Sequence, residues 1–120
     1  MKVLVAEDDR QLLGLWLEVF SDAGHEVQGA MTAREARTAL LTGEFDVAIL
    51  DLWLGVDSGL SIATMASYAN PDCKIILITG SNLFARGELF ELAPSIGTVL
   101  RKPVPIAELL AVSEHSEAIA

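Results

Sequence analysis

Carboxylate, hydroxyl and ammonium side chains follow four short apolar segments of this chain, at the points where strands are expected to end. In chain order they are Glu7, Asp8, Asp9, Asp51, Thr79 and Lys102. Convergent carboxylates suit Mg²⁺, which typically takes one or two of them and fills its other positions with water and phosphate oxygens. The lysine adds a positive charge and the threonine adds a hydroxyl donor. Together these groups predict a site for a phosphoryl group carried on a carboxylate.

Each of these residues also has a simpler explanation. Asp8 and Asp9 could cap a helix, because aspartate is favoured at that position, and for Asp9 this explanation is as good as the functional one. Thr79 could simply end a strand, and Lys102 could be a surface lysine. The agreement among four strand ends is what favours a shared site.

The apolar segments that must position these groups predict strands. VLVA (3–6), VAIL (47–50) and IILI (75–78) are apolar throughout, which is typical of strands buried on both faces of a parallel sheet. HEVQGA (25–30) is more mixed and predicts a less covered strand, and TVLR (98–101) completes a set of five.

Helix signals alternate with the strands. The first expected helix has apolar residues at helical spacing from Leu13 to Phe20 and ends at Gly24, and the second runs from a cap at Thr32 to Gly43. The third runs from a cap at Ser58 to about Ala69, and the fourth runs from Asn82 to Leu92. The fifth begins at Pro105. Strict alternation predicts a three-layer α/β sandwich, with five helices covering both faces of a five-stranded parallel sheet. Ligands in such folds lie beyond the carboxyl ends of the strands, where the strand order reverses.

Composition narrows the function. The chain is 52% hydrophobic and carries a net charge of −9 without a cluster of Lys or Arg. Direct binding to nucleic acid or to an anionic membrane is therefore disfavoured. Cys73 is the only cysteine, which excludes an intrachain disulfide and a metal site built from several cysteines. With neither a signal-peptide pattern nor a long apolar run, a cytoplasmic location is expected.

The motifs that follow four of the predicted strands occur in an order that resembles one known protein family. The acidic run 7–9 follows the first strand, Asp51 and Ser58-Gly59 follow the third, Thr79 follows the fourth, and Lys102-Pro103 follows the fifth. In this order the chain resembles a receiver domain of a two-component response regulator, with the flavodoxin-like fold of the bacterial chemotaxis regulator. The resemblance covers essentially the whole chain. It implies one receiver domain over residues 1–120, with strand order 2-1-3-4-5 and no output domain in this chain.

The resemblance also implies a metal site for Mg²⁺ or Mn²⁺. Asp51 is implied as the phospho-acceptor and, together with Asp8, as a direct metal ligand. Trp53 is implied to offer its backbone carbonyl, and Glu7 to hold the metal through water.

The remaining implied residues serve the phosphoryl group. Thr79 is implied to contact a phosphoryl oxygen, and Lys102 to pair with the phosphate or with Asp51. The Lys102–Pro103 peptide bond is expected to be cis. Gly80 is small, which keeps the pocket open to a phosphodonor.

A sensor histidine kinase or a histidine phosphotransfer protein is the donor that the resemblance implies. The chain would then signal to an unknown downstream protein through a conformational switch. A homodimer through the face of the fourth helix, fifth strand and fifth helix could carry that output. The chain modifies itself and has no separate substrate, so it is not expected to be an enzyme, although autodephosphorylation is expected.

Three positions depart from the family pattern. Gly55 replaces a usual proline, which predicts a more mobile loop. Val99 replaces a usual aromatic residue and is too short and stiff to report phosphorylation in the same way. Trp53 lies where a bulky indole could shield the phosphoryl group from water.

Other functions remain to be weighed. Gly55 and Val99 would fit a degenerate receiver that acts as a phosphorylation-independent interaction module. A phosphatase of the haloacid dehalogenase type usually needs a second acid two residues after its nucleophile, and Trp53 stands there instead. A flavin-binding flavodoxin is disfavoured, because the acids after the first strand would repel the flavin phosphate.

Overall fold

A parallel five-stranded sheet forms the centre of the molecule. The computed structural model describes residues 1–80 and 96–115 of the 120-residue chain. The sheet contains β1 (Lys2–Ala6), β2 (Glu26–Ala30), β3 (Val47–Asp51), β6 (Lys74–Thr79) and β7 (Ile96–Arg101). Their order is β2-β1-β3-β6-β7, and all four pairings are parallel. The predicted order 2-1-3-4-5 is therefore confirmed, since β4 and β5 belong to a separate hairpin.

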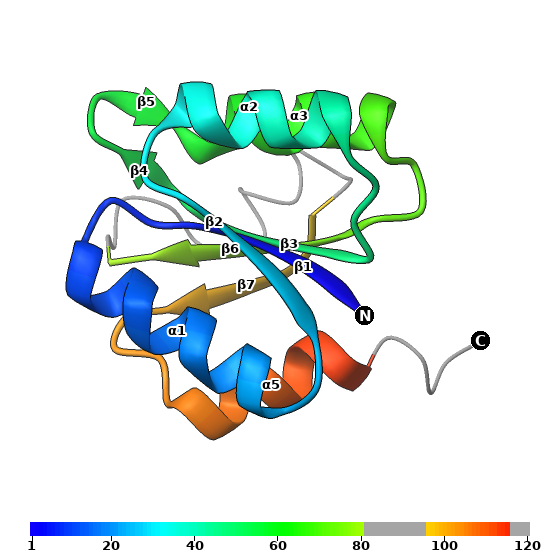
Figure 1. Cartoon of the computed structure of the whole chain (residues 1–120). Helices are drawn as coiled ribbons and strands as arrows, with labels where there is room; N and C mark the ends of the chain where they lie inside the picture. The colour runs from blue at the N-terminus through cyan, green and yellow to red at the C-terminus, as the bar shows by residue number, and fades with distance from the viewer. Residues whose placement is uncertain (81–95, 116–120) are drawn as a thin grey trace.

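Four helices are described, and they cover the two faces of the sheet. They are α1 (Arg10–Asp22), α2 (Ala33–Thr42), α3 (Gly59–Ala69) and α5 (Ile106–His115). Figure 1 shows α2 and α3 side by side on one face, with α1 and α5 on the other. This arrangement confirms the three-layer α/β class. The helix predicted from Asn82 to Leu92 lies outside the described residues. Within the described part of the chain, no helix is long and apolar enough to cross a membrane.

The helices begin where the sequence predicts. The carboxylate of Asp9 accepts hydrogen bonds from the backbone N–H groups of Gln11 and Leu12, at 3.0 and 3.2 Å, and so caps α1. Thr32 caps α2 through a 3.1 Å bond from the N–H of Glu35. Asp9 is therefore a helix cap, and the predicted cap at Thr32 is confirmed.

The hydrophobic interior consists of two clusters, one on each face of the sheet. Successive strand residues alternate between them: Leu4 and Leu50 lie in the cluster under α2 and α3, whereas Val5 and Ile49 lie in the cluster under α1 and α5. Because both faces are covered, every position of β3 is buried, as the continuous apolar run predicts.

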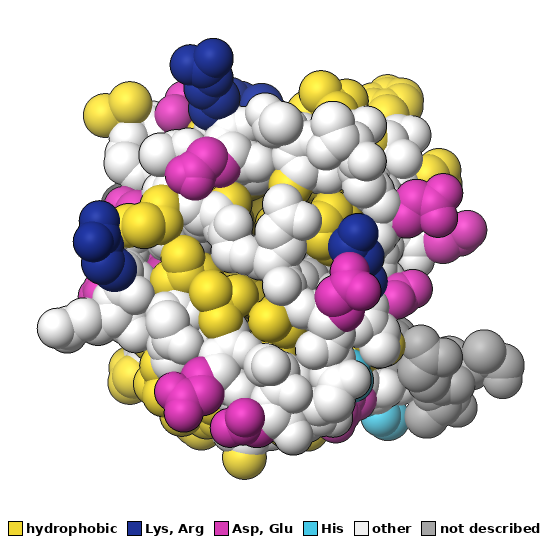
Figure 2. All heavy atoms as spheres, viewed as in Figure 1, with side chains coloured by type: hydrophobic (Ala, Val, Ile, Leu, Met, Phe, Trp, Pro, Cys, Tyr) yellow, Lys and Arg dark blue, Asp and Glu magenta, His cyan; other side chains and the backbone are white. Residues whose placement is uncertain are grey.

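The edge strand β2 is less covered, also as predicted. Only Ala30 of its five residues is fully buried. Figure 2 shows the face on which β2 lies, where hydrophobic side chains appear between scattered acidic and basic groups rather than beside a basic patch.

The sequence did not predict a small antiparallel hairpin between β3 and α3. It consists of β4 (Trp53–Leu54) and β5 (Asp57–Ser58), and its turn contains Gly55 and Val56. Gly55 has a φ of +65°, in the region that glycine adopts at little cost. The mobility expected at Gly55 stays a prediction, but the residue has a defined position at the start of a two-residue turn.

Candidate functional site

Three carboxylates converge at the carboxyl ends of β1 and β3. These strands pair directly, with Ala6 opposite Leu50, so the residues that follow them meet at one edge of the sheet. One carboxylate oxygen each from Glu7, Asp8 and Asp51 lies within 4.8 Å of the others. Glu7 is completely buried and Asp51 is 7% exposed, whereas Asp8 is exposed. The predicted convergence of these acids is therefore found in the structure.

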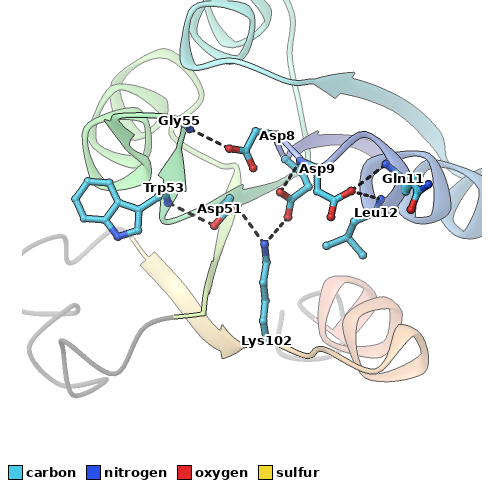
Figure 3. A network of polar contacts seen from close by, with 9 residues as sticks. Asp8, Asp9, Gln11, Leu12, Asp51, Trp53, Gly55 and Lys102 are labelled. Carbon is cyan, nitrogen blue, oxygen red and sulfur yellow. Dashed lines mark hydrogen bonds and ion pairs between the residues drawn. The ribbon is translucent and has the colours of Figure 1, made fainter.

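Lys102 reaches into this cluster from the end of β7. Its Nζ lies 2.7 Å from Oε1 of Glu7 and 3.2 Å from Oδ2 of Asp51. Figure 3 shows the Lys102 side chain extending toward Asp51. The backbone N–H of Lys102 donates to the carbonyl oxygen of Thr79 at 2.8 Å, which fixes the start of the loop beside β6. The Lys102–Pro103 bond is cis, as predicted. The lysine thus joins two of the three acids, and its contact with Glu7 is the shorter one.

The charges in this cluster depend on one another. Burial raises the pKa of Glu7, against the opposing effects of the Lys102 ammonium and the backbone N–H of Asp9. For Asp8 burial also acts upward, but the hydrogen bond from the Gly55 N–H, together with the neighbouring Glu7 carboxyl and the charge of Lys102, outweighs it and lowers the pKa of Asp8. Burial acts to lower the pKa of Lys102, and its bonds to Glu7 and the charge of Asp51 outweigh that effect and raise it. The lysine is therefore held in its charged form.

The donor set fits a hard divalent cation. It consists of carboxylate oxygens that lie close enough together to share one ion. Both oxygens of Glu7 already accept hydrogen bonds, from Lys102 and from the N–H of Asp9 at 3.1 Å. Both oxygens of Asp51 also accept, but at longer distances, 3.2 Å from Lys102 and 3.4 Å from the N–H of Trp53. Glu7 is therefore more firmly engaged than Asp51, which agrees with the indirect role expected for Glu7.

Of the other predicted site residues, Thr79 and Gly80 lie beside Lys102, whereas Val99 lies in the core. Thr79 is buried at the end of β6, opposite Arg101 of β7. Gly80 is exposed, and a side chain built there would first approach the Lys102 side chain, at 4.0 Å. Val99 is 3% exposed and belongs to the cluster under α2 and α3.

The indole of Trp53 does not cover the Asp51 carboxylate. Figure 3 shows it turned away from that carboxylate, and the residue is 45% exposed. The backbone N–H of Trp53 instead faces Asp51 Oδ1, at a long 3.4 Å. The arrangement seen here therefore gives no support to the expectation that Trp53 shields a phosphoryl group.

Gly59 was noted in the sequence only as part of the Ser58-Gly59 motif, and the structure gives it a packing role that was not predicted. Gly59 begins α3, and a Cβ atom built there would collide with the carbonyl oxygen of Asp51 and lie 3.2 Å from Cα of Leu52. Its N–H donates to the carbonyl of Leu52 at 2.6 Å. Glycine at this position lets the helix pack directly against the backbone of the acidic residue. The Ser-Gly pair was the signal that could have identified it.

Carboxylates and a lysine at the carboxyl edge of a 2-1-3-4-5 parallel sheet define a flavodoxin-like domain with an acidic, cation-compatible site. Residues 3–114 match the family model of the response regulator receiver domain, and the chain belongs to that family. It is therefore a receiver domain of the two-component response regulator type.

Individual relatives agree with this assignment. The response regulator receiver protein CpdR of Brucella abortus is 28% identical over 109 residues, which cover 91% of this chain and 90% of CpdR. AlgB of Pseudomonas putida, an alginate biosynthesis transcriptional regulator, is 30% identical over 78 residues, which cover 65% of this chain. The chain spans only 17% of the length of AlgB.

A solved structure supports the comparison. A response regulator from Burkholderia pseudomallei, described with a phosphorylated aspartic acid, a calcium ion and citrate, superimposes with a TM-score of 0.83 at 26% identity. The match covers 98% of this chain and 69% of that one.

Proposed function

We propose that the chain accepts a phosphoryl group on the Asp51 carboxylate in a reaction that requires Mg²⁺ or Mn²⁺. The observation that carries the proposal is the position of Asp51, whose carboxylate lies 3.2 Å from the Lys102 ammonium and clusters with two further acids at the carboxyl edge of the sheet. A carboxylate so placed can attack phosphorus while a cation and an ammonium balance the added negative charge.

The residues then divide the work. Asp8, Asp51 and the backbone carbonyl of Trp53 would hold the cation, and Glu7 would support it through water. The cation supplies charge neutralisation and orients the phosphoryl oxygens when it is bound. An oxygen of Asp51 forms the new bond to phosphorus as the bond between phosphorus and the donor breaks, and the donor leaves with the electron pair.

Two residues are proposed to stabilise the product. Lys102 already contacts Asp51 and can move its ammonium onto a phosphoryl oxygen with little displacement. Thr79 donates its hydroxyl to another phosphoryl oxygen. Gly80 leaves the approach to both open.

The donor and the output are further parts of the proposal. Receiver domains are phosphorylated regulators rather than enzymes with a separate substrate. A sensor histidine kinase or a histidine phosphotransfer protein supplies the phosphoryl group, and the domain loses it again by autodephosphorylation. The output is a protein contact, with a homodimer through the face of the fourth helix, β7 and α5 as one form of it, of which the fourth helix lies outside the described residues.

Phosphorylation by a small donor tests the proposal directly. The protein is incubated with Mg²⁺ and acetyl phosphate and its intact mass is measured, beside the variants Asp51→Asn and Asp57→Asn. Asp57 is a suitable control because it is an exposed acid in the adjoining hairpin and loses the same charge.

One added phosphoryl group on the wild type and on Asp57→Asn, with none on Asp51→Asn, is the expected result. Addition that persists in Asp51→Asn would place the acceptor elsewhere. A wild-type chain that neither binds Mg²⁺ nor gains mass would favour the phosphorylation-independent interaction module.

A further inference from the structure

A backbone hydrogen bond connects the β4–β5 hairpin to the acidic cluster. The N–H of Gly55 donates to Oδ2 of Asp8 at 3.1 Å, across 47 residues of sequence, and Figure 3 shows this bond spanning from the hairpin to the β1–α1 loop. Asp8 is exposed, so its surroundings leave the carboxylate room to rotate. The bond from Gly55 therefore restricts the orientation of a carboxylate that packing does not hold.

The bond depends on the conformation of the turn. Gly55 opens the two-residue turn with a φ of +65°, and the strand pairs Leu54–Asp57 and Trp53–Ser58 hold that turn in place. A proline could not make the same contact, because it has no N–H and its φ is fixed near −65°. Space is not the constraint, since a Cβ atom at residue 55 would meet nothing within 4 Å.

The bond also leaves part of Asp8 available. A carboxylate has two oxygens, and Gly55 engages only Oδ2. The second oxygen remains for a cation shared with Asp51. Groups that hydrogen-bond a metal-ligating carboxylate typically change metal affinity by roughly 10- to 100-fold when they are removed.

We infer that the hairpin turn is a positioning element of the cation site: the Gly55 N–H orients Asp8, so that cation affinity and hairpin order are coupled. The inference rests on the cation role proposed above for Asp8. The inference requires an ordered turn, because a mobile loop could not hold the Gly55 N–H in a fixed position against Asp8. Since coupling is reciprocal, a bound cation must restrict the hairpin by the same factor by which an ordered hairpin improves cation affinity.

Replacing one amide by an ester isolates this bond. Glycolic acid in place of Gly55, introduced by semisynthesis, removes the N–H while it keeps the chain length and the absence of a side chain. The matched control is the corresponding ester at Val56, which alters the same turn and keeps the Gly55 N–H. Binding of Mg²⁺ alone is measured by calorimetry, and hydrogen exchange of residues 53–58 is measured with and without Mg²⁺.

The expected result is that the ester at residue 55 weakens Mg²⁺ binding about tenfold, whereas the ester at residue 56 stays within about twofold of wild type. Mg²⁺ should also slow exchange in the hairpin of the wild type more than in the ester at residue 55. Equal or tighter Mg²⁺ binding by that ester would overturn the inference, while phosphorylation of Asp51 by acetyl phosphate would still support the proposed function. A wild-type chain that binds no Mg²⁺ would overturn both.

Discussion

Replacement of Gly59 by alanine tests how closely the acceptor carboxylate depends on α3. A Cβ atom at residue 59 would collide with the carbonyl oxygen of Asp51 and lie 3.0 Å from its carbonyl carbon. Non-bonded atoms prefer about 3.5–4.0 Å, so the start of α3 and the Asp51–Leu52 backbone must separate by roughly 1 Å. The Asp51 carboxylate moves with its backbone and away from its 3.2 Å contact with Lys102.

Two magnitudes follow from this shift. Overpacking of this kind costs about 1–3 kcal/mol of stability, and each kcal/mol lowers the melting temperature of a domain of this size by roughly 4 °C. Misplacement of a reacting group by about 1 Å can reduce a rate about 100-fold. The Gly59→Ala variant should therefore melt earlier and, while still folded, gain its phosphoryl group from acetyl phosphate about 100-fold more slowly.

Gly14→Ala is the matched control for this experiment. Gly14 lies in the exposed interior of α1, and a Cβ atom there would meet nothing within 4 Å. The same substitution should stabilise the chain by about 0.5–1 kcal/mol and leave the rate of phosphorylation unchanged. Both rates are measured by intact mass at a temperature where circular dichroism shows each variant to be folded. A folded Gly59→Ala variant that is phosphorylated at the wild-type rate would refute the reasoning.

Three further predictions concern metal binding, the core and the thiol. Mg²⁺ at a hundred times its Kd should stabilise the wild type by about 2.7 kcal/mol. Thermal melts with and without Mg²⁺ should show that Asp8→Asn loses this stabilisation, whereas Asp9→Asn keeps both the stabilisation and the helix cap. An equal loss in the two variants would contradict the assignment of Asp8. Asn70→Ala removes a buried side chain that accepts from one backbone N–H and donates to one backbone carbonyl, each at 2.9 Å; the expected loss is about 2–4 kcal/mol in urea unfolding, and an unchanged midpoint would count against it. Burial, together with the charge of Asp46, raises the pKa of Cys73 to about 12. The thiol should therefore react slowly with a disulfide reagent at neutral pH, and its rate should rise about tenfold for each unit of pH increase until the pH reaches that pKa. A native rate equal to that of the urea-unfolded chain would disprove the shift.

The strands and helix starts could be predicted because local patterns determine them. A strand covered on both faces needs apolar side chains throughout, and β1, β3 and β6 show such runs. Asp9 and Thr32 could be recognised as caps because their side chains bond N–H groups only two or three residues away. The convergence of the acids then followed from the parallel order of the strands.

The contacts that depend on side-chain geometry could not be predicted in the same way. The chain was expected to pair Lys102 with Asp51 or a phosphate, but its shorter contact is with Glu7, 95 residues away in sequence. The β4–β5 hairpin was missed because two-residue strands are too short to show alternation. The bond between Gly55 and Asp8 depends on that hairpin. Glycine in place of the family's usual proline suggested only a mobile loop, but the structure gives Gly55 a defined contact with Asp8.

The division of the interior into two clusters has a consequence for how this chain can change. Among the described residues the two clusters have no member in common, because the sheet separates them. Substitutions placed one in each cluster, and well apart, should therefore add in free energy, and each layer can drift in composition without a compensating change in the other. Val99 and Leu100 are neighbours in β7, yet their side chains belong to different clusters on opposite faces of the sheet. The exception in the α2–α3 layer is Gly59, where α3 packs directly on the backbone of Asp51, so a change at that position would also reach the acidic site.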